Sequence, residues 1–167
     1  MEDQNRETDF PTLFGPDDAA VDDKGRLAIS KTKREWLGPN FTMLQCDLGI
    51  LAIYPRPVWE QLYRRILRLK LNNRGRMLYE SQILGSAHEN MNCDKEGRVV
   101  IPLSLRNKLN LGGPLQLRAV GSYIQVWTER DYEAWMENDE AFNANWQQRV
   151  QKALALIEEE ERERGLV

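Results

Sequence analysis

Two stretches of the chain repeat the same order of apolar and polar positions. Each begins with a turn-forming Asp-x-x-Gly-Arg segment, continues as a short apolar strand and leads into a short helix. The strands are expected at 26–29 and 98–101, and Pro102 ends the second strand before a helix at 103–109. Ser30 takes the place of this proline in the first copy, where it is expected to cap the following helix. Further strands are expected at 41–46, 50–54, 115–119 and 124–127.

Two other segments have apolar residues spaced three and four apart, which predicts amphipathic helices. The first starts at Trp59 and continues to Lys70, with arginines on its other face, and is expected to link the two copies. The second lies in the tail and leads into a charged run at 158–164 that is expected to fray. Its apolar positions are Trp146, Val150, Ala153, Leu154 and Ile157.

The two stretches align with each other at an offset of 72 residues. Val21–Ile29 falls on Cys93–Ile101, and the register continues to Arg34 on Arg106. A second block, Gly49–Tyr54, aligns with Ser122–Trp127 after one inserted residue. The repeated unit of about 42 residues is too small for a core of its own and would leave strand edges exposed. Interleaved hairpins from the two copies would correct both problems.

The expected fold class is therefore α+β and mainly β, with two tandem β modules forming a pseudo-dimeric barrel. A linker helix and a C-terminal helix complete it. The expected domains are a disordered N-terminal extension (1–13), module 1 (14–58), a linker with an amphipathic basic helix (59–87), module 2 (88–134) and an acidic helical tail (135–167).

Charge is distributed unevenly along the chain, although the formal net charge is only −3. Residues 56–76 contain seven basic residues and one acid, whereas 129–164 contain eleven acids and five bases. A local basic face could meet phosphates while the acidic end points elsewhere. The simpler alternative is that both runs are solvated helix faces.

Several classes of protein are disfavoured by the composition. Cys46, Cys93 and the single His88 are too few to build a zinc site within one chain, and no metal or cofactor is expected. The chain lacks a second histidine, a glycine-rich phosphate loop and a nucleophile–base pair, so an enzyme is not expected. No apolar run is long enough for a membrane span, and Met1–Phe10 lacks the pattern of a signal peptide, so a cytoplasmic location is expected.

Several motifs together match a known family pattern. They are Phe14-Gly15, Asp22–Leu27, Tyr54-Pro55 with Trp59, Asp94–Pro102 and Leu105-Arg106. In these residues the chain resembles the MraZ family of bacterial regulators, which have two swapped-hairpin modules of the SpoVT/AbrB type. The resemblance covers about residues 13–135. It implies a ring-forming homo-oligomer, associated with the nucleoid, that binds direct repeats upstream of the division and cell-wall gene cluster, including its own promoter. Ser30 in place of the usual proline, the acidic N-terminal extension and the long tail depart from the family pattern.

The two Asp-x-x-x-Arg turns are the candidate contacts to double-stranded DNA. An arginine at a stiff turn can make a bidentate contact to guanine or hold a phosphate, while the aspartate orients it and the glycine lets the backbone approach closely. The other interpretation is that both Asp–Arg pairs only hold the module together. The expected DNA-binding residues are Lys24, Arg26, Lys95 and Arg98, and the expected supporting residues are Asp22, Gly25, Asp94 and Gly97.

The first turn is expected to face DNA more directly than the second. Lys24 stands where the second copy has the acidic Glu96, although Lys95 reduces this contrast. A second hypothesis is a protein-interaction or assembly module, either antitoxin-like or a scaffold, because swapped-hairpin proteins also serve in these roles and the acidic tail could bind a partner.

Overall fold

The computed structural model describes residues 10–138 and 146–165. The chain divides after Thr128 into two compact units, of which the first is mainly β. In chain order, the first unit contains β1 (Leu13–Val21), β2 (Arg26–Ala28), α1 (Lys31–Leu37), β3 (Phe41–Gln45), β4 (Leu51–Tyr54), α2 (Arg56–Leu67), α3 (Arg74–Gln82), a short 3-10 turn (Leu84–Ser86), β5 (His88–Met91), β6 (Arg98–Val100), α4 (Leu103–Leu109), β7 (Gly113–Gly121) and β8 (Ile124–Thr128).

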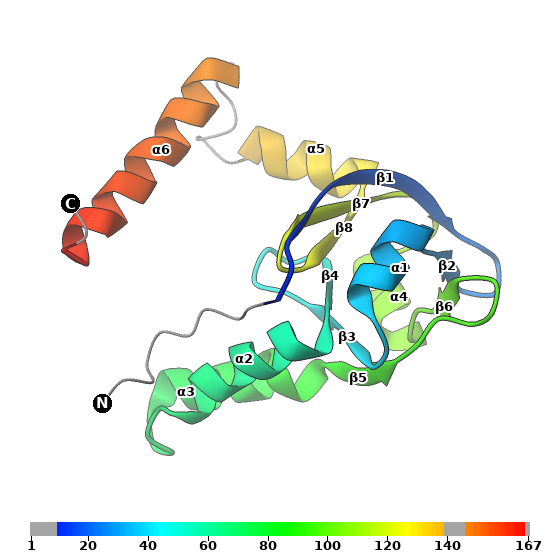
Figure 1. The fold of residues 1–167 in the computed structure, drawn as a ribbon, viewed down its shortest axis with the longest axis horizontal. Coiled ribbons are helices and arrows are strands. Elements are labelled where there is room, and N and C mark those ends of the chain that lie inside the picture. Colours follow the sequence, from blue (N-terminus) through cyan, green and yellow to red (C-terminus); the bar gives the residue numbers. More distant parts are fainter. Residues whose placement is uncertain (1–9, 139–145, 166–167) are drawn as a thin grey trace. The chain divides into compact units, whose positions relative to one another are not determined.

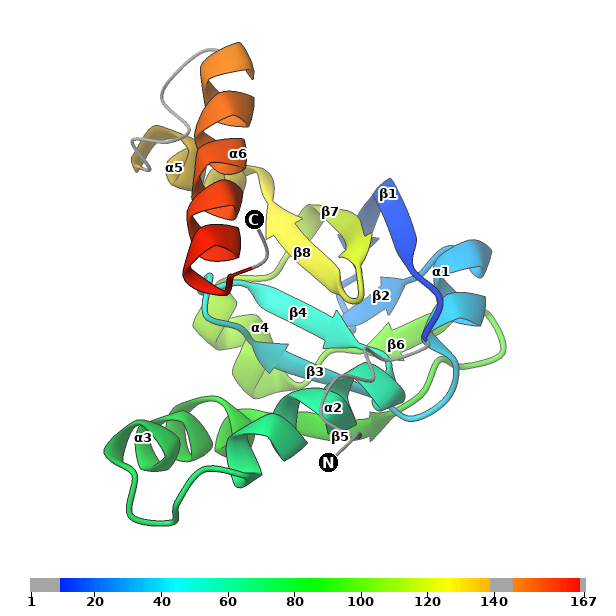
Figure 2. The same cartoon turned by 60° about the vertical axis from the view of Figure 1, so that its left-hand side comes forward.

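The strands of the two copies interleave in one sheet of eight strands, in the order β5-β3-β4-β8-β7-β1-β2-β6. The sheet curls into a nearly closed barrel, as Figures 1 and 2 show. Strand β1 of module 1 pairs with β7 of module 2, and β5 of module 2 pairs with β3 of module 1. The equivalent strands β4 and β8, and β2 and β6, pair with each other. The expected α+β, mainly β class with interleaved modules is confirmed.

The longest strand pair joins the two copies. All nine residues of β1 pair with β7 in antiparallel register, from Leu13 opposite Gly121 to Val21 opposite Gly113. On β7 the side chains alternate, with Leu115, Leu117 and Ala119 facing inward, as a strand with one buried face requires. Each copy therefore supplies backbone partners that the other copy lacks.

The core lies inside this sheet and draws on both copies. Leu27 and Val99 face each other at the centre of the β2–β6 pair, and both are buried. Ile29 and Ile101 follow them and are also buried. The two copies thus share one continuous hydrophobic cluster, which is why neither has to support a core alone.

The short helices α1 and α4 follow β2 and β6 as expected. Helix α4 spans Leu103–Leu109 after Pro102, and helix α1 follows Ser30. Ser30 lies at the N-cap position of α1 as expected, but its side chain makes no hydrogen bond to the helix end, so the expected capping contact is absent. Its hydroxyl instead donates to Asp17 Oδ2 on β1 over 2.7 Å. Where the second module has the pyrrolidine ring of Pro102, the first module therefore has a side-chain hydrogen bond that links the start of α1 to β1.

The linker differs from the single helix expected from periodicity. Helix α2 ends at Leu67 and a second helix, α3, starts at Arg74, and the two lie side by side (Figures 1 and 2). Asn73 caps α3 by accepting a hydrogen bond from the backbone N–H of Arg76 over 2.9 Å. Of the expected apolar stripe, Trp59 and Ile66 are buried, but its C-terminal end from Leu67 onward is exposed.

The second unit contains α5 (Glu129–Asn138) and α6 (Trp146–Glu163). Helix α6 includes most of the charged run that was expected to fray, and its Leu154 and Ile157 are exposed. The side chains of the other apolar positions expected in the tail lie outside the described residues, as do residues 1–9 of the extension expected to be disordered. Within the described residues, no helix combines the length and apolar character that crossing a membrane requires.

Candidate nucleic-acid interface

The first turn is built around the carboxylate of Asp22. Its Oδ1 accepts hydrogen bonds from the backbone N–H groups of Lys24 (3.0 Å) and Arg26 (2.8 Å), and its Oδ2 accepts from Arg26 Nε over 2.7 Å. Gly25 donates its N–H to the Asp22 carbonyl and has φ of 77°, a conformation that favours glycine. These hydrogen bonds within the turn hold Arg26 in a defined orientation.

The second turn repeats this arrangement with one addition. Asp94 Oδ1 accepts from the backbone N–H groups of Glu96 (3.0 Å) and Arg98 (2.9 Å), and Oδ2 accepts from Arg98 Nε over 3.2 Å. Gly97 has φ of 78°. A terminal nitrogen of Arg98 also lies 3.4 Å from Glu96 Oε2, so this arginine faces two carboxylates where Arg26 faces one.

Both turn aspartates are stabilised in their charged form. The backbone N–H of Arg26, followed by its guanidinium, lowers the pKa of Asp22 from its ordinary value. The backbone N–H of Arg98 and the charge of its guanidinium lower the pKa of Asp94 in the same way. Each turn thus contains an ionised carboxylate at neutral pH, and the internal Asp–Arg pairs considered in the sequence are present.

The two arginines nevertheless lie on one solvent-facing surface. Arg26 and Ala28 flank the buried Leu27 on β2, and the antiparallel register puts Ala28 opposite Arg98 of β6. Opposed residues of an antiparallel pair project to the same face, so both arginines lie on the outer face of the β2–β6 ribbon. Their side chains are 28% and 31% exposed, respectively, so neither is sealed inside the fold.

The expected charge difference between the turns is not found when all their residues are counted. Lys24 and Lys95 are both exposed. Asp23 stands where the second copy has Lys95, which offsets the contrast between Lys24 and Glu96. Each turn therefore contains two acids and two bases, and the difference lies in the extra carboxylate contact of Arg98.

Two arginines that were not among the predicted site residues lie against the turn glycines. The guanidinium of Arg106 occupies the space where a Cβ on Gly25 would be, and that of Arg34 does the same at Gly97. Each belongs to the module opposite to the turn that it contacts. The alignment of Arg34 with Arg106 was visible in the repeat, but their glycine partners depend on the interleaved fold.

The basic run of the linker is partly neutralised. Arg56 and Arg64 lie 3.0 and 3.5 Å from the carboxylate of Glu60. Arg76 is 8% exposed and contacts Glu80, so it is not part of a basic surface. The free basic face expected over residues 56–76 is correspondingly smaller than the sequence count indicated.

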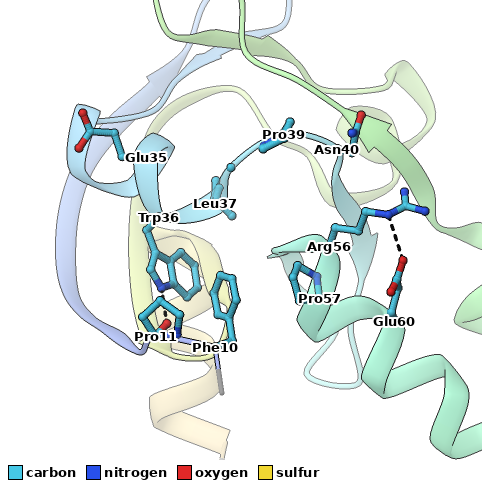
Figure 3. Close-up of a pocket in the computed structure, with 11 residues that line it drawn as sticks. Phe10, Pro11, Glu35, Trp36, Leu37, Pro39, Asn40, Arg56, Pro57 and Glu60 are labelled. Atoms are coloured by element: carbon cyan, nitrogen blue, oxygen red, sulfur yellow. Dashed lines mark hydrogen bonds and ion pairs between the residues drawn. The ribbon is translucent and has the colours of Figure 1, made fainter. Parts of the chain in front are cut away.

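An open cleft of about 540 Å³ lies between the C-terminal end of α1 and the start of α2 (Figure 3). Trp36 and Phe10 meet there edge to face, and Trp36 Nε1 donates to the carbonyl of Pro11 over 2.6 Å. Arg56, paired with Glu60, borders the other side. This cleft has no signal in the sequence, because its lining comes from segments that are distant in the chain.

Metal-binding and reactive groups are sparse in the part of the chain that the structure describes. Among the described residues, no group of three histidine, cysteine or acidic side chains is placed to hold a metal ion. Cys46 and Cys93 are free thiols, and burial raises the pKa of both. Both thiols are therefore protonated at neutral pH, as expected for small apolar residues packed in or beside the core.

Two interleaved β modules with a rigid Asp–Arg turn in each define a swapped-hairpin protein. The family model for the MraZ protein, which has the descriptor "antitoxin-like", matches residues 83–154. The chain is 32% identical over 126 residues to "Transcriptional regulator MraZ" of Nitrosococcus oceani, covering 72% of this chain and 84% of that protein. It is 33% identical over 123 residues to the protein of the same name in Marinobacter nauticus, covering 70% and 81%. The chain belongs to the MraZ family of transcriptional regulators.

Proposed function

We propose that this regulator binds DNA sequence-specifically through its two Asp-x-x-x-Arg turns. Arg26 and Arg98 would read base edges or hold phosphates, and Lys24 and Lys95 would contact phosphates. Asp22, Gly25, Asp94 and Gly97 would hold the turns in the required geometry. The division into modules 14–58 and 88–134, joined by the linker 59–87, is part of the same proposal.

The observation that carries the proposal is the common outer face of Arg26 and Arg98 on the β2–β6 ribbon. Asp22 engages Arg26 through Nε, the nitrogen nearest to the chain. A bidentate contact to guanine O6 and N7 can use the two terminal nitrogens of the guanidinium. The aspartate would therefore orient the arginine and leave its outer edge available to DNA.

The turns of a single protomer give little net attraction to phosphates, because the acidic and basic charges within each turn cancel. Phosphate contacts supply most sequence-independent affinity, so several protomers acting together would be needed. In line with the family resemblance, we propose a ring-shaped homo-oligomer in the cytoplasm, associated with the nucleoid. Its targets would be direct repeats in the promoter of the division and cell-wall gene cluster, including its own promoter.

A second candidate function is binding to a protein partner as an antitoxin-like or scaffold module. The descriptor of the matching family model favours it. So does a group of exposed apolar residues on the α2–α3 hairpin, which includes Leu71 (79% exposed) and Met77 (57% exposed). The two functions predict different effects of the turn residues, because a protein-binding hairpin would not depend on Arg26.

The test is binding of the purified protein to upstream promoter DNA, measured by fluorescence anisotropy at several salt concentrations. We expect Arg26→Ala to weaken specific binding by roughly 10- to 100-fold, equivalent to about 1–3 kcal/mol, with no loss of folding. Lys24→Ala should weaken specific and non-specific binding alike and reduce the salt slope by about 1. The matched control is Arg164→Ala, which removes the same charge from an exposed site in α6's C-terminal flank. Wild-type affinity of Arg26→Ala would contradict the assignment of the first turn.

A further inference from the structure

We propose that Arg106 and Arg34 are positioning residues that hold each DNA-contacting turn from the opposite module. Arg106 of module 2 would position the turn Asp22–Arg26, and Arg34 of module 1 would position the turn Asp94–Arg98. The inference rests on the proposed function of the two turns in DNA binding. Its structural part, the dependence of each turn on the other module, can be tested without DNA.

The contact between Arg106 and the first turn is close and specific. The atoms nearest to a hypothetical Cβ on Gly25 are Cζ, Nη1 and Nε of Arg106, and all three lie closer to it than real Cβ contacts allow. Arg106 Nε also donates to the carbonyl of Ile101 over 2.9 Å. The planar guanidinium therefore lies between the end of its own β6 strand and the glycine of the other module.

The backbone closes this link. The N–H of Ile101 donates to the carbonyl of Gly25 over 2.9 Å. Ile101 therefore makes both links, because its carbonyl accepts from Arg106 and its N–H donates to Gly25. Helix α4 carries Arg106 in its last turn, so the position of the first DNA turn is tied to a helix of the second module.

The same arrangement recurs in the opposite direction. Arg34 Nη1 donates to the carbonyl of Ile29 over 2.5 Å, and its guanidinium lies against Gly97. The N–H of Ile29 donates to the carbonyl of Gly97 over 3.0 Å. Two independent copies of the sequence therefore build the same cross-module contact, which separates it from an incidental packing of one long side chain.

The chemistry of the contact requires arginine in particular. A flat guanidinium can stack on a glycine that has no Cβ and at the same time donate along its edge to a carbonyl. Lysine carries a point charge on a flexible stem and cannot make both contacts. Arg34 and Arg106 are both half-buried, which fits a positioning role better than the exposed position of Lys24 and Lys95.

The first experiment is hydrogen–deuterium exchange of the full-length protein without DNA, followed in peptides covering 22–26 and 94–98. We expect Arg106→Ala to speed exchange in the first turn by roughly threefold or more and to leave the second turn unchanged. Arg34→Ala should do the reverse. The matched controls are Lys108→Ala and Lys31→Ala, which remove exposed charges from the same two helices. In a variant that keeps the wild-type thermal stability, faster exchange in the variant's own module, in both turns equally or in neither would overturn the proposal.

The second experiment is a double-mutant cycle on DNA affinity. If Arg106 acts through the first turn, the ~10- to 100-fold loss caused by Arg26→Ala should shrink to about threefold or less in the Arg106→Ala background. The loss caused by Arg98→Ala should stay unchanged in that background. Arg106→Lys should not restore binding. Additive effects with both turn arginines, or rescue by lysine, would instead make Arg106 an independent phosphate contact.

The two experiments separate the two ways of failing. If Arg26→Ala leaves DNA affinity unchanged while the exchange pattern is as expected, the proposed DNA contact is wrong and the cross-module contact stands. If Arg26→Ala weakens binding but exchange shows no cross-module effect, the positioning role fails alone. Thermal unfolding of Arg106→Ala and the milder Arg106→Gln identifies a general loss of folding, which would speed exchange in both turns.

Discussion

The first module contains a buried charge at a position where the second module has an apolar residue. Lys33 is 4% exposed, and its Nζ lies 2.6 Å from Asp17 Oδ2 on β1. The repeat puts Leu105 at the equivalent position, and it is also 4% exposed. The hydrogen bond from Lys33 is the main cause that lowers the pKa of Asp17, so this carboxylate is charged at neutral pH. Asp17 remains partly exposed, which limits the desolvation cost of the pair.

Removal of the carboxylate should therefore destabilise the fold more than removal of the whole pair. Asp17→Ala leaves the ammonium of Lys33 without its counter-charge, and we expect a loss of about 1–3 kcal/mol in the free energy of unfolding. Adding Lys33→Leu, which copies the second module, should restore most of the wild-type value. Urea denaturation of the two variants and the wild type provides the measurement. A double variant that is less stable than Asp17→Ala would show that Lys33 packs for reasons other than its charge.

One buried side chain links the two helices of the linker, α2 and α3. Arg76 on α3 donates to the carbonyls of Leu67 (3.2 Å) and Leu69 (2.5 Å), where α2 ends. Helix C-termini leave carbonyls without intrahelical partners, and a cation there also interacts favourably with the helix dipole. A residue that appeared to belong to a basic surface instead holds two helices together.

Replacement of this arginine should loosen the hairpin and leave the barrel intact. We expect Arg76→Met to speed hydrogen exchange in 62–82 by roughly tenfold, while the β-strand amides keep wild-type protection. Arg74→Met, at an exposed position two residues earlier, is the matched control. Equal loss of protection in β7 and β8 would mean that the hairpin is part of the cooperative core.

The elements that the sequence predicted well are those with clear local signals. Helix α4 begins after Pro102 and spans the expected residues, because proline suits a helix start and cannot continue a strand. Strand β1 has no such signal. It includes Gly15, Pro16 and Asp17, and it is a strand because β7 of the other module pairs with its whole length. The second linker helix, α3, was missed because its apolar residues Met77, Leu78 and Tyr79 are consecutive and give no helical period.

In the candidate site, too, the sequence predicted the features that have local signals. The Asp–Arg contacts are local, four residues apart, and the repeat was enough to propose them. The roles of Arg34 and Arg106 depend on which copy's glycine lies beside which helix, and only the interleaved pairing of strands decides that. The internal repeat could identify the strands and helices of each module, but it could not show which of them pair with the other module.

The outer face that carries both arginines is shared by the two modules. Strands β2 and β6 each supply one arginine, and the helix of each module contacts the turn of the other. Neither module could present this ribbon alone. Fusion of the two copies on one chain makes their pairing intramolecular and so keeps the ribbon assembled at any protein concentration.

DNA binding by such a small face should depend on assembly of several chains. We expect light scattering to give a mass several times that of the 19.5 kDa chain. Promoter DNA that keeps one direct repeat should bind at least ~100-fold more weakly than DNA with all repeats, because linked sites gain effective concentration. Insertion of half a helical turn between repeats should weaken binding too, since it moves one repeat to the opposite side of the duplex. A strictly monomeric protein, with and without DNA, would exclude the ring and require all affinity to come from one β2–β6 ribbon.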